Sequence, residues 1–160
     1  MTSRTELPRV RCLPANPAAL SEAREFVREL AEERRLSEQM GEELALAVTE
    51  ACSNAVRHTD SLLVLVSWRE GDLVVEVQVK DDGIFERKLP ITGPAGREGG
   101  LGMALMMMMV DEFAIRQGTY ESPGTLVRLR KNVVRTEEPV LMVLPDPAAS
   151  SDESPERRSA

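Results

Sequence analysis

Cysteine is scarce in this chain, which has only Cys12 and Cys52 among its 160 residues. The two cysteines stand in a predicted strand and a predicted apolar helix, so they do not form the disulfide framework of a small secreted domain. The sequence also lacks a run of about 20 apolar residues, which a membrane-spanning helix needs. Residues 1–10 hold no apolar stretch of the kind found in signal peptides. We therefore expect free thiols, a cytoplasmic location and no membrane partner.

A cluster of basic residues is missing as well. The formal net charge is −7, and residues 136–160 account for much of it, with six acidic and two basic side chains. Domains that bind nucleic acid usually carry a basic patch or stripe. We therefore expect no direct contact with nucleic acid.

The length of the chain suits one domain with a substantial core. We predict that this domain spans residues 1–135 and that residues 136–160, rich in proline, serine and acid, form a flexible acidic tail. The apolar sequence EPVLMVL at 138–144 leaves two alternatives to a free terminus, which are local docking and binding to a partner. We expect the Met106–Met109 run to pack in the core, because a helix this apolar is usually buried.

Apolar periodicity and turn residues predict the secondary structure. The expected elements are a strand at 7–13, a helix after Asn16-Pro17, a helix from Ser37 to about His58, a hairpin of strands 61–69 and 72–80, a helix at 102–111, and a hairpin of strands 112–118 and 124–131. Asn16 and Ser37 are the expected N-caps of the first two helices. Strands paired as hairpins beside separate helices predict an α+β fold, a two-layer sandwich with a mixed or antiparallel sheet covered by helices on one face.

Glu50 and Asn54 lie four residues apart in the predicted helix ELALAVTEACSNAVRH, so both side chains share one face. An amide oxygen can supplement nucleotide phosphates and water around Mg²⁺. A carboxylate one turn away can accept a proton from an attacking water or hydroxyl. The alternative is a polar stripe facing solvent, which is the commoner meaning of an isolated pair. The apolar residues on most sides of this pair favour a site.

Asp81 ends a strongly apolar predicted strand and is followed by Asp82-Gly83. A carboxylate there can accept a hydrogen bond from an exocyclic amine such as that of adenine, and Gly83 would let the backbone approach a flat ring. The alternative is an ordinary turn, because Asp-Gly is a common turn dipeptide.

Gly99, Gly100 and Gly102 come just before a predicted helix, where free N–H groups and the helix dipole can bind phosphate oxygens. Neither a Walker phosphate loop nor a dinucleotide fingerprint fits the spacing. The alternative is a flexible hinge. Between Gly83 and these glycines runs a long loop of the kind that is usually functional or mobile. Within it, Arg97 is a better candidate than Lys88 for reaching a γ-phosphate.

Together and in this order, the blocks resemble the anti-sigma-factor serine/threonine kinases of the sporulation and stress-response type, within the GHKL ATPase superfamily. TEACSNAVRH (49–58) is similar to the N box and VKDDG (79–83) to the G1 box. EGGLGMALMMMMVDE (98–112) is similar to the G2 box, and GTLVRLRK (124–131) to the closing strand. The resemblance covers roughly residues 7–132 and implies a Bergerat-type ATPase fold.

The resemblance also implies roles for particular residues. Glu50 would be the general base and Asn54 the Mg²⁺ ligand. Asp81 would bind the adenine amino group, with Gly83 beneath the base and Thr125 supporting Asp81. The nucleotide contacts implied beside the G2 box are Arg97, Gly100, Leu101, Gly102 and Met103. The loop between Gly83 and Gly99 would be the ATP lid.

A protein of this kind would use ATP and Mg²⁺ to phosphorylate a serine on a STAS-domain anti-sigma antagonist, and would sequester a sigma factor. Homodimerisation is a further expectation from the resemblance. A sensor histidine kinase would need a separate dimerisation and phosphoacceptor domain, for which 160 residues leave no room. The alternative is a regulatory module that binds ATP or ADP without catalysis.

Overall fold

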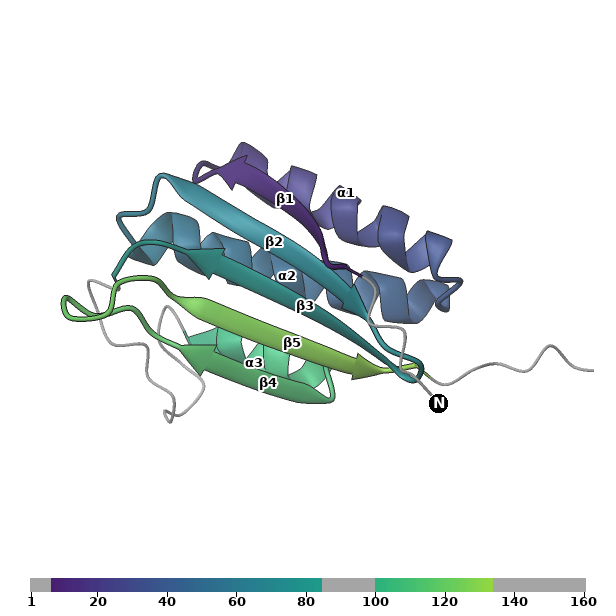
Figure 1. The fold of residues 1–160 in the computed structure, drawn as a ribbon. Coiled ribbons are helices and arrows are strands. Elements are labelled where there is room, and N and C mark those ends of the chain that lie inside the picture. Colours follow the sequence, from purple (N-terminus) through teal and green to yellow (C-terminus); the bar gives the residue numbers. More distant parts are fainter. Residues whose placement is uncertain (1–6, 85–99, 134–160) are drawn as a thin grey trace, which may run out of the picture.

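A computed structural model describes residues 7–84 and 100–133, which form two layers (Figure 1). In chain order the elements are β1 (Arg9–Pro14), α1 (Ala18–Glu33), α2 (Glu38–His58), β2 (Leu63–Glu70), β3 (Val74–Asp81), α3 (Gly100–Met109), β4 (Glu112–Arg116) and β5 (Leu126–Asn132). Every element predicted from the sequence is present, with boundaries that shift by a few residues. The predicted long loop and acidic tail lie outside the described residues, so the division at residue 135 stays a prediction.

The strands form one sheet in the order β1-β2-β3-β5-β4. The four described pairings are all antiparallel, which decides between the two sheet types that the sequence left open. All three helices lie on one face of this sheet (Figure 1), so the predicted α+β two-layer fold is confirmed. Because β5 inserts between β3 and β4, the end of β3 lies beside the start of β5, with Lys80 opposite Leu126.

The helix ends follow the local sequence. Asn16 Oδ1 accepts a hydrogen bond from Ala18 N–H at 2.9 Å, and Pro17 already has helical dihedrals. Ser37 Oγ accepts from Met40 N–H at 3.2 Å at the start of α2. Ser37 is therefore confirmed as an N-cap. The N-cap of α1 is Pro17, one residue later than the predicted Asn16, because the helix begins at Ala18. At the other end of α1, Arg35 has a left-handed φ of 58°, a conformation that usually favours glycine.

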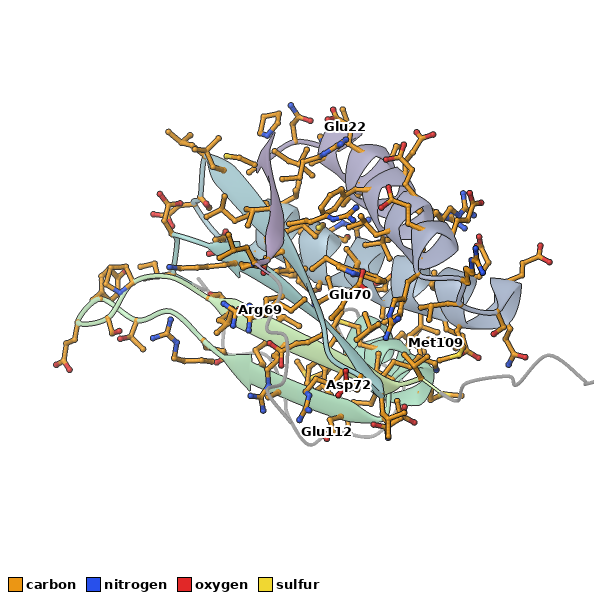
Figure 2. All side chains as sticks on the ribbon, turned by 45° about the vertical axis from the view of Figure 1, so that its right-hand side comes forward. Glu22, Arg69, Glu70, Asp72, Met109 and Glu112 are labelled. Atoms are coloured by element: carbon orange, nitrogen blue, oxygen red, sulfur yellow. The ribbon has the colours of Figure 1, made fainter. Side chains whose placement is uncertain are left out.

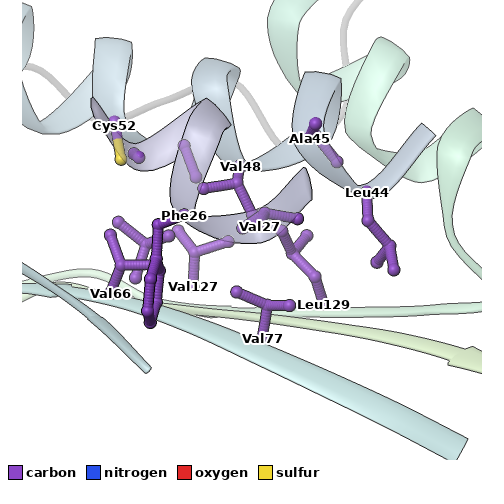
Figure 3. Close-up of a cluster of buried hydrophobic side chains, with 14 of the residues drawn as sticks. Phe26, Val27, Leu44, Ala45, Val48, Cys52, Val66, Val77, Val127 and Leu129 are labelled. Atoms are coloured by element: carbon purple, nitrogen blue, oxygen red, sulfur yellow. The ribbon is translucent and has the colours of Figure 1, made fainter. Parts of the chain in front are cut away.

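The core lies between the helices and the inner face of the sheet (Figure 3). Apolar residues of the first two helices, such as Val27 and Val48, are fully buried there. Figure 3 shows side chains from both helices above inward residues of three strands, namely Val66, Val77, Val127 and Leu129. Charged side chains such as Glu22 and Arg69 lie at the surface (Figure 2). Along β2 and β3 every second residue is buried, and the residues between are half-buried or exposed, as expected for strands with one face on the core.

The methionine run departs from its prediction. Met106 is fully buried, but Met107 and Met108 remain 58% and 78% exposed. The reason is that α3 packs mainly against α2 and β4, which cover one side of the helix and leave the other open. The prediction that the whole run packs in the core is therefore wrong for Met107 and Met108. Among the described helices, none combines the length and apolarity needed to cross a membrane.

Candidate functional site

Asp81, the last residue of β3, is a buried carboxylate held by the main chain. Its side chain is only 5% exposed, and Oδ1 accepts hydrogen bonds from Gly83 N–H at 2.9 Å and from Thr125 N–H at 3.4 Å. Burial raises the pKa of Asp81, and these two hydrogen bonds partly oppose the rise. Within the described residues, Oδ2 accepts no hydrogen bond. One oxygen is thus fixed by the fold, and the other can accept from a ligand.

Thr125 lies against Asp81, as the sequence resemblance implied. Thr125 contributes only main-chain atoms to this contact. Its N–H donates to Asp81 Oδ1, and its carbonyl accepts from Asp81 N–H at 3.0 Å. The Thr125 hydroxyl instead accepts from Gly118 N–H at 3.1 Å. Thr125 therefore positions Asp81 through the strand pairing, and its side chain holds the end of the β4–β5 connection.

Gly83 brings the turn after β3 onto the segment that follows α2. A Cβ at this position would lie 2.7 Å from Asp60 Oδ1 and 2.9 Å from both Ser61 N and Thr59 Cβ. No side chain fits in that space without a shift of the backbone. Asp60 also accepts from Ile84 N–H at 3.0 Å. The glycine therefore allows the buried carboxylate and the carboxyl end of α2 to lie side by side.

Two more glycines complete this turn, and sequence reasoning gave neither a role in the site. Gly124 has a φ of +101°, which favours glycine, and its N–H donates to the Gly83 carbonyl at 2.8 Å. A Cβ on Gly118 would collide with that same carbonyl. Nothing in the sequence marks Gly118, because its contact with Gly83 joins residues that are distant along the chain.

Glu50 faces the start of α3. A Cβ added to Gly102 would lie 2.7 Å from Glu50 Oε2, so the glycine makes room for the carboxylate. The Glu50 side chain is half-buried and makes no hydrogen bond to any residue in 7–84 or 100–133. A carboxylate whose oxygens are not engaged by neighbouring residues can take up a proton from a bound molecule.

Asn54 lies one turn further along α2 and is 9% exposed. Its amide makes no hydrogen bond within the part of the chain that the structure describes. The amide is therefore available to form hydrogen bonds with a ligand or an ordered water. Residues 7–84 and 100–133 contain no cluster of three or more histidine, cysteine or acidic side chains that could hold a metal. Mg²⁺ needs no such cluster when phosphates and water supply its other oxygens, so the Asn54 amide fits that ion.

The structure brings three of the sequence blocks together around the carboxyl half of α2. Gly83 lies against the residues that directly follow α2, and Gly102 lies against Glu50 within the helix. The other residues implied beside the G2 box differ in their exposure. Leu101 is 72% exposed, Met103 points into the core, and Gly100 begins α3. Arg97 lies outside the described residues, so its predicted role stays a prediction.

Comparison with known proteins supports this assembly of blocks. The sequence profile of the histidine kinase-like ATPase domain matches residues 13–131, more than half of the chain. No curated protein sequence matches significantly. Among solved structures, the chain is similar to a crystal structure of the RsbU and RsbW domains of Rv1364c from Mycobacterium tuberculosis, with a TM-score of 0.62 and 21% identity. That match covers 80% of this chain and 33% of the other, and at this identity it shows the fold alone.

Proposed function

The chain belongs to the histidine kinase-like ATPase domain family, and we propose that it binds Mg²⁺-ATP between α2, the end of β3 and the start of α3. The observation that carries this proposal is Asp81. This buried carboxylate has Oδ1 fixed by two main-chain donors and Oδ2 without a donor from the described residues. The exocyclic amine of adenine is a donor of the right kind for Oδ2. An acceptor that would otherwise stay unsatisfied gives the site its preference for such a base.

The phosphates of ATP would lie toward the start of α3. The first turn of this helix carries N–H groups without intrahelical partners, and Gly100 and Gly102 leave them accessible to phosphate oxygens. On the opposite side, the Asn54 amide would hold Mg²⁺. When bound, the ion would neutralise charge on the transferring phosphoryl group.

Glu50 is the residue that would take the proton. Its carboxylate lies against Gly102, at the phosphate end of the proposed site. As general base it would accept the proton of an incoming hydroxyl while that oxygen forms its bond to the γ-phosphorus and the bond to the ADP oxygen breaks. The geometry supports this role because Glu50 has no hydrogen bond to other described residues that would compete for its oxygens.

We infer from the motif set that the incoming hydroxyl belongs to a serine of a STAS-domain anti-sigma antagonist. The unphosphorylated antagonist would release the protein from a sigma factor, and phosphorylation would restore sequestration. Serine specificity, the two partners, a homodimer and a cytoplasmic location all belong to this proposal and rest on the resemblance of the sequence blocks.

The test is phosphotransfer from γ-labelled ATP to a STAS-domain substrate, with the full chain and Mg²⁺. We expect Glu50→Gln to reduce transfer at least a hundredfold while ATP still binds, and we expect the surface variant Glu22→Gln to transfer normally. Undiminished transfer by Glu50→Gln would refute the assigned role. Stable complex formation without any label transfer by the wild type would support the alternative, a regulatory module that binds nucleotide without catalysis.

A further inference from the structure

The exposed side of α3 is entirely apolar. The helix sequence GLGMALMMMM contains no polar side chain. Met103 and Met106 lie on its buried side. The opposite side is open to solvent and consists of Leu101, Ala104, Met107 and Met108. We call these four residues the α3 stripe. Residues 101, 104 and 108 lie on one face at helical spacing, with 107 beside them, so the stripe is continuous along the helix.

A helix that is apolar all round is normally covered on every side. Here three of the exposed side chains, Leu101, Met107 and Met108, are 72%, 58% and 78% exposed. Scattered exposed apolar residues are ordinary, but a contiguous apolar strip marks a surface that binds something. Methionine side chains adapt easily to the shape of a bound segment. The stripe therefore has the chemistry of a docking surface for an apolar peptide.

The described chain ends beside this surface. Lys131 Nζ donates a hydrogen bond to the carbonyl of Met109, the last residue of α3, at 2.8 Å (Met109 is labelled in Figure 2). One residue later, Asn132 N–H donates to Asp111 Oδ2 at 2.7 Å. Val133 N–H in turn donates to the Leu73 carbonyl at 2.9 Å. The described chain therefore ends near the carboxyl end of α3, the end of the helix that carries Met107 and Met108.

The chain that follows contains one segment suited to this surface. Residues 139–144, PVLMVL, belong to the longest apolar run among residues 134–160, and they include all its large aliphatic side chains. Six extended residues span roughly 20 Å, and a ten-residue helix is about 15 Å long. The residues between 133 and 139 can reach up to about 20 Å, which lets the run turn back along α3. A tethered segment also competes at an effective concentration in the millimolar range.

We propose that residues 139–144 of the chain itself cover the α3 stripe. This inference does not rest on the proposed function, because the stripe is apolar whether or not ATP binds. It has a consequence for the site nonetheless, since the covered helix carries Gly100 and Gly102. A partner that displaced the segment would act on the helix that begins at the proposed phosphate site.

Methyl NMR of the full chain, with the methionine methyl groups ¹³C-labelled and without nucleotide, tests the proposal. We expect Leu141→Asp to move the Met107 and Met108 signals toward the position of free methionine and to leave that of Met103 unchanged. The control Ala149→Asp adds the same charge beyond the apolar run and should move none of them. Amide exchange in α3 should become roughly tenfold faster in Leu141→Asp only. Identical Met107 and Met108 signals in the wild type and Leu141→Asp would overturn the proposal.

A reciprocal variant separates the chain's own segment from other occupants. Met108→Lys should move the Met142 methyl signal toward free methionine, and this change should not depend on protein concentration. If the wild-type Met107 and Met108 signals shifted with dilution, a second copy would be the occupant and the proposal would be wrong. ATP binding, measured on the same samples, distinguishes failure of this proposal from failure of the proposed function.

Discussion

Replacing Gly102 by alanine is expected to displace the Glu50 carboxylate. The added Cβ would lie 2.7 Å from Glu50 Oε2, whereas ordinary van der Waals contact begins at 3.4 Å, so the oxygen must retreat by about 0.7 Å. The carboxylate is the end of a flexible side chain, so it can move without disrupting the fold. Alanine also favours a helix over glycine by about 1 kcal/mol. We therefore expect a folded Gly102→Ala variant whose proposed base is misplaced.

Displacement of the Glu50 carboxylate should slow phosphotransfer. A misplacement approaching 1 Å can slow a positioned reaction by about a hundredfold, so we expect kcat at saturating ATP to fall roughly 10- to 100-fold. Ala104→Ser, two residues along the same helix and exposed, serves as the matched control and should react at the wild-type rate. Thermal unfolding of both variants checks that the fold is retained.

A double variant shows whether the effect runs through Glu50. If Gly102→Ala acts by moving that carboxylate, adding it to Glu50→Gln should cause little further loss. Multiplicative losses would mean that the two residues act separately. A wild-type rate for Gly102→Ala at saturating ATP would refute the reasoning that this contact positions the base.

Three other predictions concern stability and reactivity. Burial raises the pKa of Asp81 in the folded state. The protonated group therefore stabilises the fold at low pH, and this stabilisation is lost as the pH rises through the pKa of the folded state. Denaturant unfolding should therefore find Asp81→Asn at least as stable as the wild type at neutral pH, with the difference shrinking in acid, and a less stable variant at neutral pH would contradict this. Arg35→Gly should raise the free energy of unfolding by about 0.5–1 kcal/mol, because φ there is 58°, whereas Glu32→Gly inside α1 should lower it by about 1 kcal/mol. Burial raises the pKa of the Cys52 thiol to about 12, so a thiol reagent at pH 8 should label only the exposed Cys12 in the native protein. Rapid labelling of both cysteines would show that Cys52 is not buried.

Local patterns were enough to predict most of the fold. The Ser37 N-cap and the hairpin around Gly71 depend on residues close together in the sequence, and the structure confirms both. The strand order was not predictable, because the insertion of β5 between β3 and β4 depends on pairing between segments far apart in the chain. The exposure of Met107 and Met108 was missed for a related reason. Composition shows that a helix is apolar but not how many neighbours surround it.

In the candidate site, too, the sequence predicted individual residues but not the contacts between residues that are distant along the chain. Glu50, Asn54, Asp81 and Gly83 were singled out because each stands in a short motif with a chemical meaning. What the sequence could not supply was the contact geometry between these residues, such as the close approach of Gly102 to Glu50. Gly118 was missed altogether, since its close approach to the Gly83 carbonyl exists only in three dimensions.

The most direct test of the central claim is a calorimetric titration of the full chain with ATP, with and without Mg²⁺. We expect the wild type to bind ATP and Mg²⁺ to strengthen the binding. We expect Asp81→Asn to weaken binding by roughly 10- to 100-fold, because a hydrogen bond to a charged group contributes about 1.5–3 kcal/mol. The surface control Asp72→Asn should bind like the wild type. Absence of binding by the wild type, or unchanged binding by Asp81→Asn, would contradict the proposed nucleotide site.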